Sequence, residues 1–215
     1  MTPPVNPSPP ATVFVVDDDP SFLLSIARLL RASGFAVRSF ASAAEFLSQL
    51  PAEAAGCVVV DLQMPGMNGL ELQEALAKTP NPLPLVFLTG HGEVPDAVSA
   101  VRRGAEDFLS KRAPRKELLS AVNRALARDA QERAERARVR GLRARFEALT
   151  ERDREVLQHV LRGQLNKQIA GDLGIDERSV KRHRTSIMSK LHVQSVSELT
   201  HLVHEAGLAS MIPPP

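Results

Sequence analysis

The first half of the chain alternates short β-branched, apolar runs with stretches of helical periodicity, and this alternation restricts the fold more than any other feature. Five runs are expected as strands: Thr12–Val16, Phe35–Arg38, Cys57–Val60, Leu85–Leu88 and Asp107–Leu109. The third and fourth runs are apolar at nearly every position, as is typical of central parallel strands that helices cover on both faces. The pattern predicts an α/β fold built on a doubly wound, five-stranded parallel sheet.

The stretches between these strands carry start signals of helices. We expect helices at about residues 21–33, 43–50, 69–78 and 94–103, and a fifth that starts near residue 114. Asp19 before Pro20 indicates an N-cap followed by proline at the first helical position. Capping-box spacing marks two further starts, at Ser42 with Glu45 and at Asn68 with Glu71. The signals therefore agree with the strand assignment.

The rest of the chain differs from this domain in composition. Residues 1–10 are proline-rich and lack an apolar signal core, so we expect a disordered lead-in before a domain at residues 11–125. Residues 126–147 are rich in alanine, arginine and glutamate, which favours an exposed helical or charged linker, with a coiled coil as the alternative. Residues 148–210 contain four short helical patterns and no strand pattern. This last part is expected to be a small all-α, four-helix domain.

Charge and cysteine content limit the environment of the protein. Residues 1–112 hold 8 lysines and arginines against 12 acidic residues, whereas residues 113–215 hold 19 against 13, within a total charge of +2. A basic second half is compatible with a polyanionic partner. No apolar run approaches the roughly 20 residues that span a bilayer. The single cysteine, Cys57, heads an apolar run and is expected to be a buried hydrophobic residue, so we expect a cytoplasmic protein without a disulfide.

Polar side chains stand where the predicted strands end. Asp17-Asp18-Asp19 follows the first strand, Asp61 the third, Thr89 the fourth and Lys111 the fifth. The carboxyl ends of parallel strands meet at one edge of a sheet, so these residues are expected to form one cluster. Clustered carboxylates suit Mg²⁺, which prefers a few carboxylate oxygens together with water and phosphate. A carboxylate can then attack a phosphoryl donor, and a hydroxyl and an ammonium group can stabilise the transferred oxygens.

Four segments in this order resemble the receiver domain of bacterial response regulators, a flavodoxin-like fold. They are VVDDDPSFL, VVVDLQMPGMNGLEL, LVFLTGHG and GAEDFLSK, and the resemblance covers about residues 11–125. The resemblance implies that Asp61 is the phosphoacceptor and that Asp18 and Asp61 ligate Mg²⁺. It also implies that Asp17 acts mostly through water and that the backbone carbonyl of Gln63 is a further ligand. Asp19 is expected to be only a helix cap.

The same resemblance implies how the signal leaves the site. Thr89 would hydrogen-bond the phosphoryl group, Lys111 would pair with it, and Phe108 would change rotamer as Thr89 moves. Gly90 would leave room for that movement. One departure is Arg112, because receivers commonly have proline, often with a cis peptide, after this lysine. A non-proline cis bond costs roughly 3 kcal/mol, so the Lys111–Arg112 bond is expected to be trans or strained, and the surface around the fifth strand is in doubt.

The stretch Leu165–Leu191 has the pattern of a helix, a turn and a second helix. A short helix is expected from Asn166 to Leu173, and Asp176 is expected to cap the next one. At 100° per residue the second helix has a polar face, formed by Arg178, Lys181, Arg182, Thr185 and Ser189. The opposite face is apolar, with Val180, Ile187 and Leu191. This division suits a helix that packs on a small core and enters a major groove.

The segment LTERDREVLQHVLRGQLNKQIAGDLGIDERSVKRHRTSIMSKLHVQS closely resembles the DNA-binding domain of the LuxR type. With a receiver, this places the chain among FixJ/NarL-like regulators. The resemblance implies that Lys181, Arg182 and Thr185 face bases. Phosphate contacts are implied for Asn166, Lys167, Arg178 and Arg184. His183 is either a packed structural residue or a contact, and the last helix, with Leu199, Leu202 and Val203, either pairs with its copy in a dimer or belongs to the core.

Together these features predict a transcription regulator that phosphorylation activates. A sensor histidine kinase would phosphorylate Asp61, and the chain would then dimerise and bind double-stranded promoter DNA, with RNA polymerase as a further candidate partner. We expect no enzymatic activity beyond the receiver's own phosphoryl transfer and slow autodephosphorylation. Two alternatives stay open: a phosphorylation-independent transcription factor that uses the receiver as a dimerisation module, and a phosphohydrolase.

Overall fold

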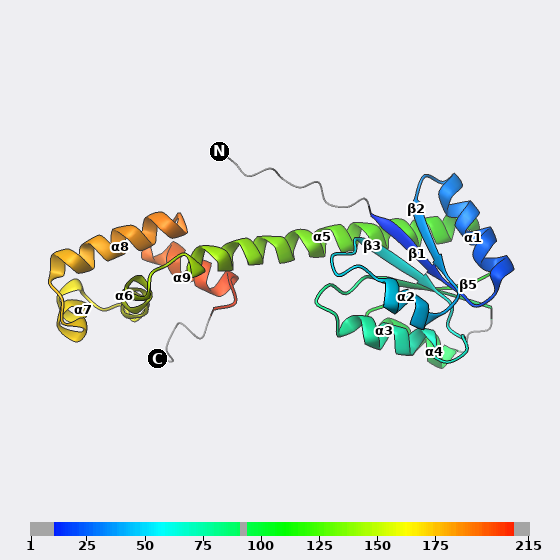
Figure 1. Ribbon diagram of the computed structural model, residues 1–215, viewed down its shortest axis with the longest axis horizontal. Helices are drawn as coiled ribbons and strands as arrows, with labels where there is room; N and C mark the ends of the chain where they lie inside the picture. The colour runs from blue at the N-terminus through cyan, green and yellow to red at the C-terminus, as the bar shows by residue number, and fades with distance from the viewer. Residues whose placement is uncertain (1–10, 91–93, 209–215) are drawn as a thin grey trace. The chain divides into compact units, whose positions relative to one another are not determined.

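A computed structural model describes residues 11–90 and 94–208 of the 215-residue chain (Figure 1). The lead-in that we expected to be disordered, residues 1–10, lies outside the described residues. The chain divides into two compact units between Arg133 and Ala134. Among the helices of the described residues, none combines the length and the apolar character that a membrane span requires.

The first unit contains a five-stranded sheet in which every paired strand is parallel. The strands are β1 (Thr12–Val16), β2 (Ala36–Phe40), β3 (Gly56–Val60), β4 (Leu85–Thr89) and β5 (Asp107–Ser110). Their order across the sheet is β2-β1-β3-β4-β5. The chain adds β2 on one side of β1 and then adds β3, β4 and β5 on the other side, as in a doubly wound sheet. The predicted fold class is therefore confirmed.

β2 is the strand whose bounds differ most from the prediction. It begins at Ala36 because the amide of Phe35 still belongs to the end of the preceding helix, where it donates to the Leu30 carbonyl at 3.1 Å. Gly34 makes this turn with φ = 92°, a conformation that glycine adopts without strain. At its other end β2 extends to Phe40, whose carbonyl accepts a 3.1 Å hydrogen bond from the amide of Asp17.

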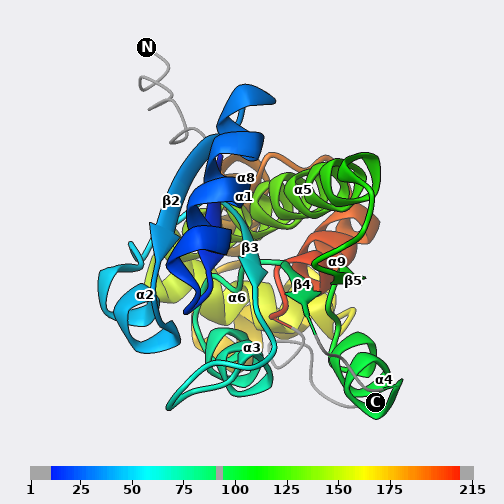
Figure 2. The same ribbon diagram turned by 90° about the vertical axis from the view of Figure 1, so that its right-hand side faces the viewer.

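Helices cover both faces of the sheet, α1 and α5 on one side and α2 and α3 on the other (Figure 2). The helices of this unit are α1 (Pro20–Ala32), α2 (Ala43–Gln49), α3 (Gly69–Ala77), α4 (Val94–Arg102) and α5 (Arg115–Glu147). The predicted caps form at Asp19, Ser42 and Asn68, and Asn68 makes a full capping box with Glu71. Cys57 is fully buried in the core beneath α1 and α5, as expected, and burial raises the pKa of its thiol to about 12.

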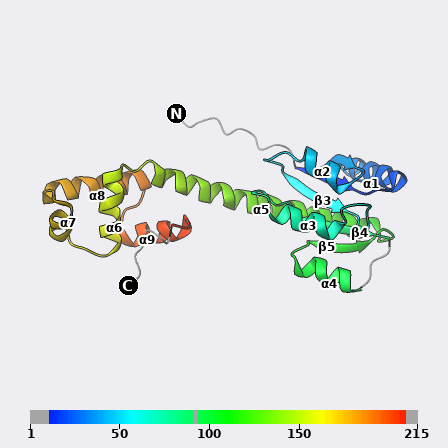
Figure 3. The same cartoon turned by 60° about the horizontal axis from the view of Figure 1, so that its bottom comes forward.

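Helix α5 is uninterrupted over 33 residues (Figure 3). Its first half packs on the sheet through the buried side chains of Leu118, Ala121, Val122 and Ala125. We had expected the helix to be exposed after residue 126. This expectation was wrong at Asp129, which is fully buried. One oxygen of Asp129 accepts the amide of Gly56 at 2.9 Å and Nε of Arg133 at 2.8 Å. A buried amide at the start of β3 requires such an acceptor. The predicted bounds of a separate linker stay a prediction.

The second unit is helical, with α6 (Glu151–Leu161), α7 (Asn166–Leu173), α8 (Glu177–Leu191) and α9 (Val196–Glu205) following the last turns of α5. Leu199 and Val203 of α9 are buried in the core of this same unit, so the alternative that they are core residues holds. Leu202 is partly buried and packs against that core. The end of α5 contributes Leu142 and Phe146.

Candidate functional site

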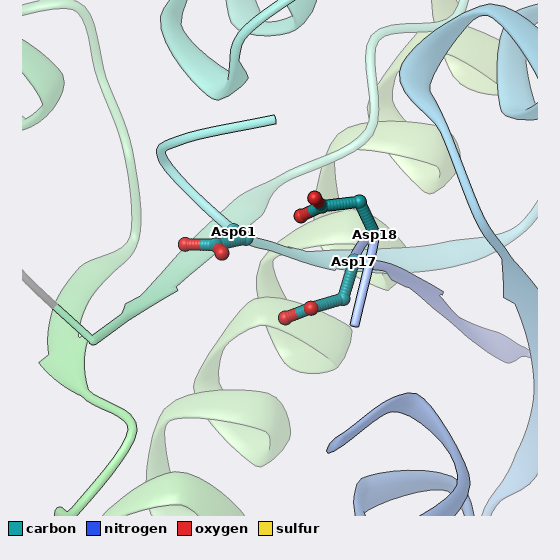
Figure 4. Close-up of side chains that lie close together, drawn as sticks. All are labelled: Asp17, Asp18 and Asp61. Atoms are coloured by element: carbon teal, nitrogen blue, oxygen red, sulfur yellow. The ribbon is translucent and has the colours of Figure 1, made fainter. Parts of the chain in front are cut away.

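Three aspartates lie together where β1 and β3 end. Oxygen atoms of Asp17, Asp18 and Asp61 lie within 4.8 Å of one another, and Figure 4 shows the three carboxyl groups side by side. Asp17 is 2% exposed and Asp61 is 8% exposed, whereas Asp18 is exposed to solvent. The sheet topology therefore brings together the residues that the sequence predicted for an acidic cluster.

Lys111 lies against two of these carboxylates. Its Nζ is 2.6 Å from Oδ2 of Asp17 and donates a 2.8 Å hydrogen bond to Oδ2 of Asp61. Burial raises the pKa of Asp17, and the hydrogen bond from Lys111 opposes this shift. Burial alone would lower the pKa of Lys111, but its hydrogen bonds to Asp17 and Asp61 outweigh this effect and the pKa is raised. The lysine therefore carries its charge into the cluster.

One oxygen of Asp61 is left without a hydrogen bond. Oδ1 is buried and has no donor among the described residues, while Oδ2 is held by Lys111. A buried carboxylate oxygen without a partner costs free energy. Three carboxylates around such an atom form a set of hard oxygen ligands of the kind that divalent cations prefer. The residues present therefore fit a metal site.

The other predicted site residues lie at neighbouring strand ends. Thr89 is 4% exposed at the end of β4, and its carbonyl accepts the amide of Lys111 at 2.7 Å. Phe108 of β5 stands opposite Phe87 in the strand register, and the two rings are 5.8 Å apart between centroids. At Gly90 a Cβ atom would lie 3.9 Å from Cδ of Lys111, an ordinary contact. The proposed need for space at Gly90 therefore stays a prediction.

The turn after Lys111 contains a trans peptide bond and is held by hydrogen bonds to Ser110. No peptide bond between described residues is cis, so the Lys111–Arg112 bond is trans. The amide of Arg112 donates to Oγ of Ser110 at 3.2 Å, and the amide of Ala113 donates to the Ser110 carbonyl at 2.8 Å. The Arg112 side chain is exposed. Arginine in place of proline is thus accommodated by an ordinary turn.

The predicted helix-turn-helix is formed by α7 and α8. Asp176 caps α8 by accepting the amide of Ser179 at 2.9 Å, as expected. The face predicted to be polar is exposed, with Arg178, Lys181, Arg182, Thr185 and Ser189. The opposite face is buried, with Val180, Ile187 and Leu191. Lys167, in the first turn of α7, is exposed, whereas Asn166 and Arg184 are partly buried.

A buried carboxylate joins α6 to α8. Asp153 is 2% exposed; its Oδ1 lies 2.8 Å from Nδ1 of His183, and its Oδ2 accepts a 2.7 Å hydrogen bond from Nζ of Lys190. Thr150 completes a capping box with Asp153. The contact with Asp153 agrees with the structural alternative for His183, and a DNA contact by His183 stays a prediction. The contacts of Asp153 with His183 and Lys190 join helices that are distant in sequence, so the sequence did not indicate them.

The stability of the second unit is expected to fall in acid because of Asp153. Burial raises its pKa, but hydrogen bonds from Lys190, His183 and Thr150 outweigh burial and lower the pKa from 3.8 to about 2. Because the pKa is lower in the folded state, the ionised carboxylate stabilises the fold above about pH 4. This contribution to the free energy of unfolding is about 2 kcal/mol, and it is lost as the pH falls toward 2. Urea unfolding of wild type and Asp153→Asn between pH 6 and pH 2.5 measures it. The difference between the two should shrink across that range; a constant difference would contradict the assignment.

Two family models match the chain, one in each part. Residues 13–123 match the response regulator receiver domain, and residues 147–203 match the bacterial regulatory proteins of the luxR family. The fold and its two sites define a DNA-binding response regulator, in which a receiver with an acidic cluster is followed by a helix-turn-helix domain.

Known proteins share both parts in the same order. The response regulator protein TodT of Pseudomonas putida is 40% identical over 192 residues, which cover 89% of this chain and 85% of TodT. The transcriptional regulatory protein FixJ of Azorhizobium caulinodans is 40% identical over 198 residues, covering 92% and 93%. The solved structure of the response regulator StyR is similar at a TM-score of 0.79 with 46% identity, covering 91% of this chain and 99% of StyR.

The chain belongs to the FixJ-type response regulators, which combine a receiver domain with a LuxR-type DNA-binding domain. Its family is one of transcriptional response regulators, which does not favour the phosphohydrolase alternative. A sensor kinase and DNA are the partners that these two domains imply. The phosphorylation-independent alternative is not favoured by the relatives.

Proposed function

We propose that Asp61 accepts a phosphoryl group from a sensor histidine kinase and that its phosphorylation controls dimerisation and promoter binding. The observation that carries this proposal is the position of Asp61 between Asp17, Asp18 and Lys111, with one carboxylate oxygen lacking a hydrogen bond. A carboxylate oxygen of Asp61 attacks phosphorus and forms a new P–O bond. The P–N bond of a phosphohistidine, or the P–O bond of a small donor, breaks, and the leaving group keeps the electron pair.

The acidic cluster is proposed to hold Mg²⁺. Asp18 and Asp61 would be direct ligands, Asp17 would act mostly through water, and the backbone carbonyl of Gln63 would add a further oxygen. When bound, the cation supplies positive charge that offsets repulsion between these carboxylates and the incoming phosphoryl oxygens.

Thr89 and Lys111 are proposed to bind the transferred phosphoryl group. Lys111 already donates to Asp61 at 2.8 Å, so its ammonium can follow the charge as that charge moves from the carboxylate to the phosphoryl oxygens. The added charge of about −1.5 to −2 would draw the Thr89 hydroxyl inward, and Phe108 would change rotamer with it. The face of α4 and β5 would then be reshaped. The acyl phosphate would decay through slow autodephosphorylation.

The second unit is proposed to place α8 in a major groove. Lys181, Arg182 and Thr185 on its exposed face would contact bases. Four other side chains would contact phosphates: Asn166, Lys167, Arg178 and Arg184. A homodimer of the activated protein would bind a two-fold promoter site in the cytoplasm, where RNA polymerase is a candidate partner.

Beryllofluoride, which mimics an acyl phosphate, is the direct test of this activation. Treated with beryllofluoride and Mg²⁺, the full chain should form more dimer in sedimentation and should bind promoter fragments, recovered by pull-down from genomic DNA, about tenfold or more tightly, a coupling of about 1.4 kcal/mol. Untreated protein with Mg²⁺ alone is the control. Unchanged dimerisation and affinity would favour a phosphorylation-independent regulator.

A further inference from the structure

Lys111 has a third neighbour besides the two carboxylates. Its Nζ lies 4.3 Å from the centroid of the Phe22 ring, well within the roughly 6 Å at which an ammonium group and an aromatic face attract each other. The lysine side chain is only 17% exposed. Phe22 has no part in the phosphoryl-transfer roles described above.

The position of Phe22 is set by the same loop that supplies the aspartates. The amide of Asp19 donates to Oδ1 of Asp17 at 3.0 Å. Oδ1 of Asp19 in turn accepts the amide of Phe22 at 3.2 Å, as part of the cap of α1. Lys111 also forms an ion pair with Oδ2 of Asp17. The contacts therefore close a circuit that runs from Asp17 through Asp19, Phe22 and Lys111 back to Asp17.

The side chain of Phe22 also packs on the hydrophobic core. Phe22 is partly buried and packs against the core beneath α1 and α5, on the helix face that carries Ile26 and Leu30. Ile26 and Leu30 follow at intervals of one helical turn and are 8% and 0% exposed. Phe22 therefore belongs to the apolar face of α1 that packs on this core.

We propose that Phe22 is a positioning residue for Lys111. The ammonium of lysine is a strongly hydrated point charge on a flexible four-carbon stem with three donors. Two of its contacts are with Asp17 and Asp61, and the Phe22 ring covers a third side where water would otherwise compete. The ring thus directs the ammonium toward Asp61, which matters for phosphoryl transfer there; this inference rests on the proposed function of Asp61.

The test compares Phe22→Leu with Phe22→Tyr, because tyrosine keeps the aromatic face and leucine removes it. Initial rates of Asp61 phosphorylation by acetyl phosphate, at saturating Mg²⁺, should be about three- to tenfold lower for Phe22→Leu and within about twofold of wild type for Phe22→Tyr. The matched control is Phe35→Leu, since Phe35 is partly buried against the same core. That control should keep the wild-type rate.

A second readout does not depend on phosphorylation. In metal-free protein, the Hε resonances of Lys111 should lie upfield in wild type and in Phe22→Tyr because of the aromatic ring current, and should move to random-coil positions in Phe22→Leu. Unchanged Lys111 resonances in Phe22→Leu, or equal loss of rate in Phe22→Leu and Phe35→Leu, would overturn the proposal. If wild type is not phosphorylated at Asp61, the proposed function fails, and the metal-free spectra still decide whether Phe22 positions Lys111.

Discussion

Replacing Asp61 by asparagine is expected to reduce phosphorylation of the chain to at most about one-hundredth of the wild-type level. Asparagine has almost the same shape as aspartate, but its neutral amide is not a nucleophile for phosphorus. Lys111 would keep its contact with Asp17, so the fold around the cluster should survive. The measurement is incorporation of label from a phosphodonor, with the modified residue located by mass spectrometry and the thermal unfolding of the variant recorded alongside.

The matched control for this variant is Asp107→Asn in the same domain. Asp107 lies at the first position of β5, and its carboxylate pairs with Arg124 on the surface. An exposed pair of this kind contributes little stability, so phosphorylation should match wild type. Label that persisted in Asp61→Asn at the wild-type level would mean that another residue, such as Asp18, is the acceptor, and would remove the basis of the proposed switch.

The acidic cluster was predictable because topology, rather than detailed packing, brings it together. Asp17 and Asp61 each follow a short apolar run, and parallel strands of similar length place their carboxyl ends at one edge. The sequence therefore predicted which residues meet. It did not predict that Lys111 would lie between Asp17 and Asp61, or that Phe22 would face it, because these contacts depend on side-chain directions set by packing.

The burial of two carboxylates, Asp129 and Asp153, could not be predicted from the periodicity of apolar residues in the sequence. Asp129 lies among alanines and arginines, and its neighbours suggested an exposed helix, yet the amide of Gly56 needs an acceptor there. A Cβ atom at Gly56 would lie 1.8 Å from the Thr12 carbonyl oxygen, so the strand begins with glycine. The contacts of Asp153 with His183 and Lys190 were not predictable from periodicity, since they join segments distant in sequence.

The residue after Lys111 illustrates a different limit. Arginine in place of proline raised doubt about the loop beside β5, because sequence alone does not distinguish a strained bond from an ordinary turn. The trans bond and the two hydrogen bonds to Ser110 settle the local geometry. The ammonium group of Lys111 is positioned by its contacts with Asp17, Asp61 and Phe22. The chemistry at Lys111 is therefore compatible with arginine or proline at position 112.

The exposed face of α8 leads to the second large prediction, which separates base contacts from phosphate contacts. Arg182→Ala should weaken binding to a pulled-down promoter fragment by about 10- to 100-fold, equivalent to about 1–3 kcal/mol, and should weaken binding to a scrambled duplex much less. Lys167→Ala should weaken binding to the two duplexes by similar factors. It should also reduce the slope of log affinity against log salt concentration by about 1. Fluorescence anisotropy at several salt concentrations measures both quantities.

The two variants are informative because each removes one positive charge, so total charge cannot explain a difference between them. Arg145→Ala, which removes the same charge from an exposed position in the last turn of α5, controls for the general attraction of a basic domain to DNA. It should change both affinities by less than about twofold at physiological salt, because Arg145 lies on α5, outside the helix-turn-helix of α7 and α8, and salt weakens the attraction between distant charges. If Arg182→Ala, like Lys167→Ala, weakened binding to the promoter and to the scrambled duplex by the same factor, Arg182 would be a phosphate contact. Sequence recognition would then have to come from Lys181, Thr185 or DNA shape.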